Sequence, residues 1–152
     1  MAFDYLQKQA VDKTSTAEYT FEEIEGAPTI RVKPALEYNK PYHAELFKRT
    51  ARLRRLVGRK KGAEGQRQVL SEMRRIDREL YPGFIIDGWD DDQGPYDKPI
   101  SEGGQRIKYS PEIAADFIKA LPDWIFDPCR DFCATVSNFA EVIEDPEELG
   151  NS

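Results

Sequence analysis

The sequence predicts a small α+β domain dominated by helix, with two short β-hairpins that are each followed by a pair of helices. Three observations lead to this prediction. Residues 18–34 and 84–109 combine strand-forming side chains with turns rich in Gly and Pro. Residues 39–80 and 110–143 repeat apolar side chains at helical spacing. At 152 residues, the chain is long enough to bury a core without metal or disulfide support.

The first β-hairpin is expected over residues 18–34, where apolar and polar side chains alternate on both sides of a turn at Glu25–Pro28. The first helix is expected to begin at Asn39, because asparagine caps helices well and Pro41 suits the first turn. Its apolar face continues to Val57.

A second helix is predicted over about 63–80 after the interruption at Gly58–Gly62, and we expect Pro82-Gly83 to end it. The second β-hairpin is then expected to pair Phe84–Trp89 with Arg106–Tyr109 across a long, irregular connection.

The C-terminal helix pair is marked by two proline signals. Ser110 caps a helix with Pro111 in its first position, and Pro122 ends that helix. Asp127-Pro128 is expected to open the last helix in the same way. The apolar face of that helix is predicted to contain Cys129, Phe132, Cys133, Val136, Ala140 and Ile143.

These elements predict an N-terminal arm of residues 1–16, a single domain of residues 17–143 and an acidic tail of residues 144–152. No apolar run is long enough to cross a bilayer, and the N-terminus lacks the pattern of a signal peptide. Two cysteines fit a reducing compartment. We therefore expect a protein of the cytoplasm in which it is made.

The charge is distributed very unevenly. Residues 48–78 hold 12 of the 22 basic residues and three acids, so their net charge is 12 − 3 = +9. The remainder of the chain then carries −6 − 9 = −15. Such a chain could pair its own halves, associate head to tail with copies of itself, or bind an acidic partner.

The acidic stretch Asp90–Asp92 before Gly94 does not fit a calcium loop. With Gly94 at the sixth position of an EF-hand loop, the first and twelfth positions are Trp89 and Ile100, and neither can bind calcium. Adjacent carboxylates on a turn point to different sides, and no His, Lys or further acid is placed to complete a catalytic pair. We expect a solvated hairpin tip that carries no chemistry.

Other signs of catalysis are absent from the sequence. Cys129 and Cys133 share a helix face, but zinc normally has four ligands and the single histidine, His43, is distant in sequence. Burial in the core explains both cysteines. Gly58–Gly62 lacks the spacing of a phosphate-binding loop. We therefore expect no enzyme, no catalytic residues, no metal and no cofactor.

The basic segment and several aromatic side chains are candidates for binding a partner. Nucleic acid would be held through phosphates with strong salt dependence, but residues 48–78 contain no aromatic side chain for base stacking. The alternative for the cations is a solvated helix face or pairing with the chain's own acids, and for the aromatics it is core packing. The predicted partner-binding residues are Arg52, Arg54, Arg55, Arg59, Lys60, Lys61, Trp89, Tyr96, Trp124 and Phe126.

The order of several short motifs resembles that of tail assembly chaperones and related minor tail proteins of tailed bacteriophages. The resemblance covers about residues 18–140 and does not include the basic segment. Its motifs are Gly26–Ala35, Asn39–Tyr42, Ile86–Trp89, Asp90–Gly94, Tyr109–Glu112, Leu121–Trp124 and Ser137–Phe139.

This resemblance implies a non-enzymatic protein that acts through contacts with other proteins. Tail assembly chaperones coat the tape measure protein, a long helical rod, until subunits of the tail tube replace them. A permanent structural subunit of the neck, tail or capsid is the alternative, and a nucleic-acid-binding module is a second one. The resemblance thus implies phage proteins and further copies of the chain as partners, and a location in the host cytoplasm or the virion.

Overall fold

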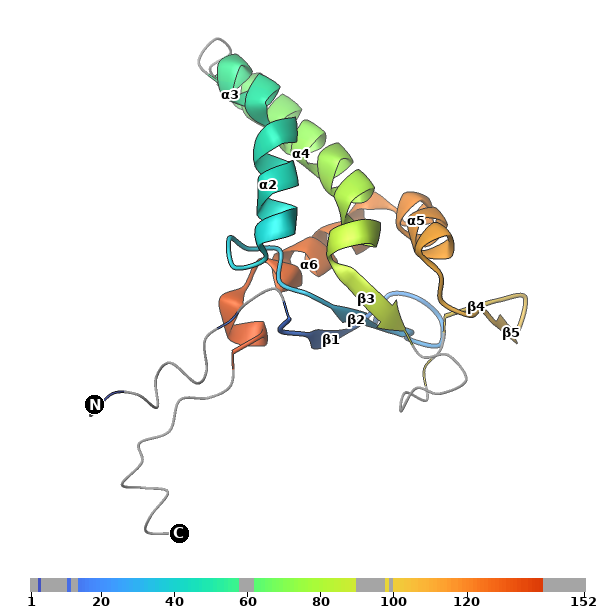
Figure 1. Cartoon of the computed structure of the whole chain (residues 1–152). Coiled ribbons are helices and arrows are strands. Elements are labelled where there is room, and N and C mark those ends of the chain that lie inside the picture. The colour runs from blue at the N-terminus through green and yellow to red at the C-terminus, as the bar shows by residue number, and fades with distance from the viewer. Residues whose placement is uncertain are drawn as a thin grey trace.

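The computed structural model describes residues 3, 11, 14–57, 62–89, 98 and 100–140, and for Leu56 and Val57 it describes the backbone alone. Helix predominates and the few strands are short and antiparallel, so the predicted α+β class is confirmed. Figure 1 shows a small sheet at one end of the molecule and a long pair of helices that projects away from it.

The main sheet has three antiparallel strands in the order β1-β2-β3. β1 (Ala17–Thr20) and β2 (Thr29–Val32) form the first β-hairpin as predicted, with Tyr19 opposite Ile30. β3 (Ile86–Trp89) pairs with the other edge of β2. The register of this pairing shifts between Arg31 and Val32 of β2.

The second β-hairpin forms at a different place from the one predicted. β4 (Ser101–Glu102) pairs with β5 (Gln105–Arg106), and Gly103 and Gly104 make the turn with φ of 58° and 79°. The predicted pairing of Phe84–Trp89 with Arg106–Tyr109 is wrong, because β3 instead pairs with β2, where Ile30 and Val32 are fully buried.

Three helices follow the first β-hairpin: α2 (Lys40–Arg49), α3 (Ala51–Val57) and α4 (Ala63–Phe84). We call them together the helical hairpin, because α2 and α3 pack along α4 (Figure 1). The predicted cap at Asn39 is confirmed, since its side chain accepts a hydrogen bond from the Tyr42 backbone N–H. The predicted first helix is divided at Thr50, whose hydroxyl donates to the Leu46 carbonyl at 2.7 Å.

α4 runs past the proline that was predicted to end it. Pro82 lies in the last turn, where it removes one backbone hydrogen bond, and its ring is buried. The backbone N–H of Ile85 closes the turn by donating to the Tyr81 carbonyl at 3.0 Å. The helix can therefore continue to Phe84.

The C-terminal part contains α5 (Pro111–Ala120), α6 (Asp123–Cys133) and a 3₁₀ turn, η1 (Val136–Asn138). Ser110 caps α5 as predicted by accepting from the Ile113 backbone N–H at 3.1 Å. Only Leu121 and Pro122 separate the end of α5 from the start of α6.

The prediction that Asp127-Pro128 opens the last helix is wrong. The Pro122 carbonyl accepts hydrogen bonds from Ile125 and Phe126, both at 3.0 Å, so α6 begins four residues earlier and contains Pro128. Its buried side chains offset the hydrogen bond that the proline removes. The predicted apolar face also ends sooner, because α6 stops at Cys133 and Val136 is 45% exposed. Ile143 lies outside the described residues.

The core lies between the sheet and the helices α4, α5 and α6. Edge-to-face aromatic pairs join these layers: Phe21 meets Phe117 of α5, and Tyr81 of α4 meets Phe126 of α6. Val11, from the predicted N-terminal arm, is also buried. The hydrophobic residues with an exposed fraction of 0% are Phe21, Ile30, Val32, Ile85, Ala114, Ile118, Phe126, Cys129 and Cys133.

Candidate protein-contact surfaces

The inner part of the basic segment pairs with acids of the same chain. Arg74 of α4 makes a two-pronged contact with Asp127 of α6, at 2.9 and 2.8 Å. Arg78 contacts Asp123 at 2.6 Å and donates to the Ile118 carbonyl at 2.6 Å. These cations hold α4 against α5 and α6, so they are structural and are not offered to a partner.

A buried polar cluster lies where the helical hairpin joins the core. Asp77 of α4 is 5% exposed and accepts hydrogen bonds from the Tyr42 hydroxyl at 2.7 Å and from Arg130 of α6 at 2.9 Å. Burial, followed by the charge of Asp77, raises the pKa of Tyr42, so its hydroxyl remains a donor. Every side chain of the cluster has a partner, and we assign it the role of joining three helices.

The outer half of the helical hairpin, defined as residues 51–57 and 62–70, is strongly basic. Its cations are Arg52, Arg54, Arg55 and Arg67 against one acid, Glu64, a net charge of 4 − 1 = +3. In the sequence, residues 58–61 add Arg59, Lys60 and Lys61 between the two halves.

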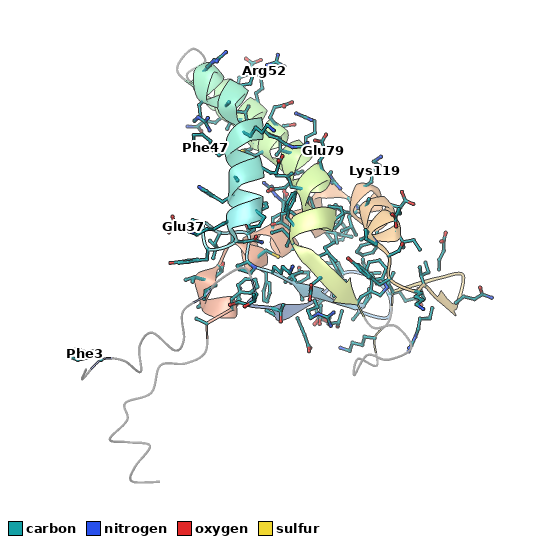
Figure 2. The ribbon with its side chains drawn as sticks, in the orientation of Figure 1. Phe3, Glu37, Phe47, Arg52, Glu79 and Lys119 are labelled. Carbon is teal, nitrogen blue, oxygen red and sulfur yellow. The ribbon has the colours of Figure 1, made fainter. Side chains whose placement is uncertain are left out.

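An exposed aromatic side chain accompanies these cations. Phe47 of α2 is 60% exposed, and the guanidinium of Arg54 lies over its ring at 3.9 Å from the centroid. Figure 2 shows Phe47 on the outside of α2 and Arg52 farther along, near the outer end of the helical hairpin. Sequence reasoning missed Phe47, because a single aromatic residue in a helix resembles a core residue.

The predicted partner-binding residues fall into three groups. Arg52, Arg54 and Arg55 are exposed on α3, and Trp124 is 64% exposed at the start of α6, so all four can meet a partner. Trp89 and Phe126 are 3% and 0% exposed, which corrects their assignment to a contact surface. The Trp89 indole donates to the Ile107 carbonyl at 2.9 Å inside the fold. The remaining residues, Arg59, Lys60, Lys61 and Tyr96, lie outside the described residues.

An open groove of about 480 Å³ lies beside α2, where this helix meets the segments before it and after α6. Its apolar lining includes Tyr38 and Val136, which are 44% and 45% exposed. The groove is completed by Ala35, Leu36, Glu37, Tyr42, His43, Leu46 and Ala134. Figure 2 shows Glu37 at this base of the helical hairpin. No local pattern predicts the groove, because its walls come from two parts of the chain that are far apart in sequence.

A second hollow, of about 560 Å³, is lined in part by Lys33, Asn39 and Asp87, whose side chains have partners within the fold. Asn39 donates to the carbonyls of Pro34 and Phe84 at 3.1 and 3.0 Å, and Lys33 lies 3.7 Å from Asp87. These groups stabilise the junction between the sheet and the helical hairpin.

The candidates for chemistry are placed as follows. Cys129 and Cys133 are fully buried and free, which confirms that they pack in the core, and burial raises the pKa of the Cys133 thiol. Among the described residues, no three His, Cys, Asp or Glu side chains gather as metal ligands. The stretch Asp90–Gly94 lies outside the described residues, so its interpretation as a hairpin tip stays a prediction.

No helix in the described ranges has the length and apolar character to cross a membrane.

Comparisons with protein-family models, with curated proteins and with solved structures found no match.

Proposed function

We propose that this protein is a non-enzymatic assembly protein of a tailed bacteriophage, which binds other virion proteins and has the tape measure protein as its partner. The observation that supports a binding role is the apolar groove beside α2. The phage context comes from the order of sequence motifs described above. In this role, the protein acts in the host cytoplasm while the tail is assembled.

The groove suits a helical partner. Amphipathic helices bind by placing a row of apolar side chains into a groove of this kind. Tyr38 and Val136 hold apolar surface in water in the free protein, and covering that surface is favourable at about 25 cal/mol per Å². A tape measure protein is a long helical rod, and it would offer such faces repeatedly along its length.

Capture of the tape measure protein of the same phage tests this proposal. Val136→Asp places a charge in the groove at an exposed position, so the variant should fold and lose capture. Leu70→Asp is the matched control, because Leu70 is a 63% exposed apolar residue of α4 that does not line the groove. Failure of the wild-type protein to capture the tape measure protein at physiological salt would contradict the chaperone role, and equal capture by both variants would exclude the groove.

The alternative role, a permanent virion subunit, makes a different prediction about location. Quantitative mass spectrometry should find a chaperone in infected-cell lysate and not in purified particles. A fixed copy number in the particles would instead assign the protein to the virion, and the groove would then be an interface between structural subunits.

A further inference from the structure

Several cations of the helical hairpin form no ion pair with the residues that the structure describes. Arg52, Arg55 and Arg67 are exposed, as is Lys48 one turn before Arg52, and none of the four forms an ion pair with another described residue. Arg52 and Arg55 are three residues apart, which places them on one side of α3, while Lys48 lies in the last turn of α2 and Arg67 lies on α4. We call these four residues the cationic end.

Four exposed acids lie on β1 and on the loop that joins it to β2. Glu18, Glu22, Glu23 and Glu25 are all exposed, none of them pairs with a described cation, and residues 18–25 contain no basic residue. Their net charge is −4. We call these four residues the anionic end.

The loop that carries Glu22, Glu23 and Glu25 is held in a defined shape. Phe21 is fully buried, and its backbone N–H donates to the Pro28 carbonyl at 2.9 Å. Ala27 donates to the Ile24 carbonyl at 2.8 Å, and Ile24 packs against the core. The acids are therefore presented by a folded turn, which lowers the entropy lost when they bind.

The two ends cannot neutralise each other within one chain. Figure 1 shows the outer end of the helical hairpin at the top of the molecule and the connection between β1 and β2 beside the sheet at the opposite end. Arg74 and Arg78, which lie nearer to the core, do reach acids of the same chain. The fold thus uses the nearby opposite charges and leaves the two distant groups exposed.

We propose that the cationic end of one copy binds the anionic end of a second copy, so that the protein associates head to tail. A contact between two different surfaces of identical chains leaves one free surface at each end, and further copies can add. A second copy fits better than nucleic acid, because the whole chain carries −6 and the anionic end offers a complementary surface on the chain itself. This inference concerns copies of the chain alone and does not depend on the groove or on the tape measure protein.

Salt dependence is the first test, because exposed charges are screened within a few ångströms at high salt. Sedimentation velocity should show an average mass that rises with protein concentration in about 0.05 M NaCl, and a monomer in about 0.5 M NaCl. A monomer under both conditions, or association that does not respond to salt, would overturn the proposal.

Charge exchange between the two ends is the decisive test. Arg52→Glu with Arg55→Glu brings the net charge of the cationic end from +4 to 0, and Glu22→Lys with Glu23→Lys brings that of the anionic end from −4 to 0. Each variant alone has then lost one of the two charged ends and should stay monomeric. An equal mixture should form a dimer, because the unchanged cationic end of the glutamate variant meets the unchanged anionic end of the arginine variant. A chain with all four substitutions has no net charge at either end and should stay monomeric. If the mixture stays monomeric, the two ends do not bind each other.

Two controls separate this proposal from its competitors. Lys40→Glu with Lys119→Glu changes the net charge as much as the arginine variant does, at exposed cations outside the cationic end, and should leave association intact. Val136→Asp should also leave it intact, so that failure of the groove and failure of the head-to-tail contact are distinguished. Salt-sensitive binding of a duplex DNA probe by a wild-type protein that stays monomeric would assign the cationic end to nucleic acid and overturn the proposal.

Discussion

The Tyr42 hydroxyl donates a 2.7 Å hydrogen bond to Oδ1 of Asp77, and both side chains are buried where α2 crosses α4. We expect Tyr42→Phe to lower the free energy of unfolding by about 1–2 kcal/mol, because a buried carboxylate loses one of its donors. Urea denaturation measures this change. Tyr38→Phe is the matched control, because Tyr38 is 44% exposed, and a loss of the same size there would contradict the explanation.

Arg130 supplies the opposing charge of the same cluster. We expect Arg130→Met to lower the free energy of unfolding by about 3–5 kcal/mol, because Asp77 would stay buried without a cation. Adding Asp77→Asn removes the buried charge, so the double variant should be more stable than Arg130→Met alone. If the losses in free energy of unfolding of Arg130→Met and Asp77→Asn simply add in the double variant, the two side chains do not stabilise each other.

Gly88 lies opposite Arg31 in the sheet and has a φ of 154°. A Cβ atom at this position would lie 2.7 Å from the Arg31 guanidinium, so we expect Gly88→Ala to destabilise the fold by about 1–3 kcal/mol. In an Arg31→Ala background, Gly88→Ala should cause a smaller loss of stability, because the steric contact with the guanidinium is gone. The loss that remains is then due to backbone strain. Thermal unfolding of the single and double variants separates these two parts, and a neutral Gly88→Ala would show that neither is present.

Asp127 makes the stability of the folded protein depend on pH. Its hydrogen bonds from Arg74, together with the charge of that arginine, lower the pKa of the Asp127 carboxyl in the folded protein. The unfolded chain therefore takes up this proton more readily. The resulting stabilisation is present above the ordinary aspartate pKa of about 3.9, and it is lost as the pH falls through the lower folded value.

We accordingly expect Asp127→Asn to be less stable than the wild-type protein at neutral pH and to lose less stability on acidification. Urea denaturation at about pH 7 and about pH 3 measures both effects. Asp116→Asn, at an exposed position of α5 with no ion pair to a described residue, is the matched control and should behave like the wild-type protein.

Features that depend on neighbours in the sequence were predicted well. The caps at Asn39 and Ser110 are local, because each side chain bonds to a backbone N–H three residues ahead. The first β-hairpin is local in the same sense. Pro82 and Pro128 were misread, because burial of their helices against the core outweighs the propensity of proline to end a helix.

Features that depend on distant parts of the chain were missed. The sequence of Ile86–Trp89 predicts a strand but does not identify β2 as its partner. Trp89 looks like a contact residue until the fold buries it beside Tyr109. The groove beside α2 needs Tyr38 and Val136 from two ends of the domain, so it could not be found before the chain was folded.

The arrangement of the main sheet has a consequence for the order of folding. Val32 and Ile86 occupy adjacent strands although 86 − 32 = 54 positions separate them, and the whole helical hairpin lies in between. Closing so long a loop directly costs chain entropy, whereas docking α2 and α3 on α4 uses closer contacts and brings the two strands together. β3 should therefore join the sheet late. In stopped-flow refolding, Leu53→Ala in the helical hairpin should slow folding, whereas Ile86→Val should mainly speed unfolding.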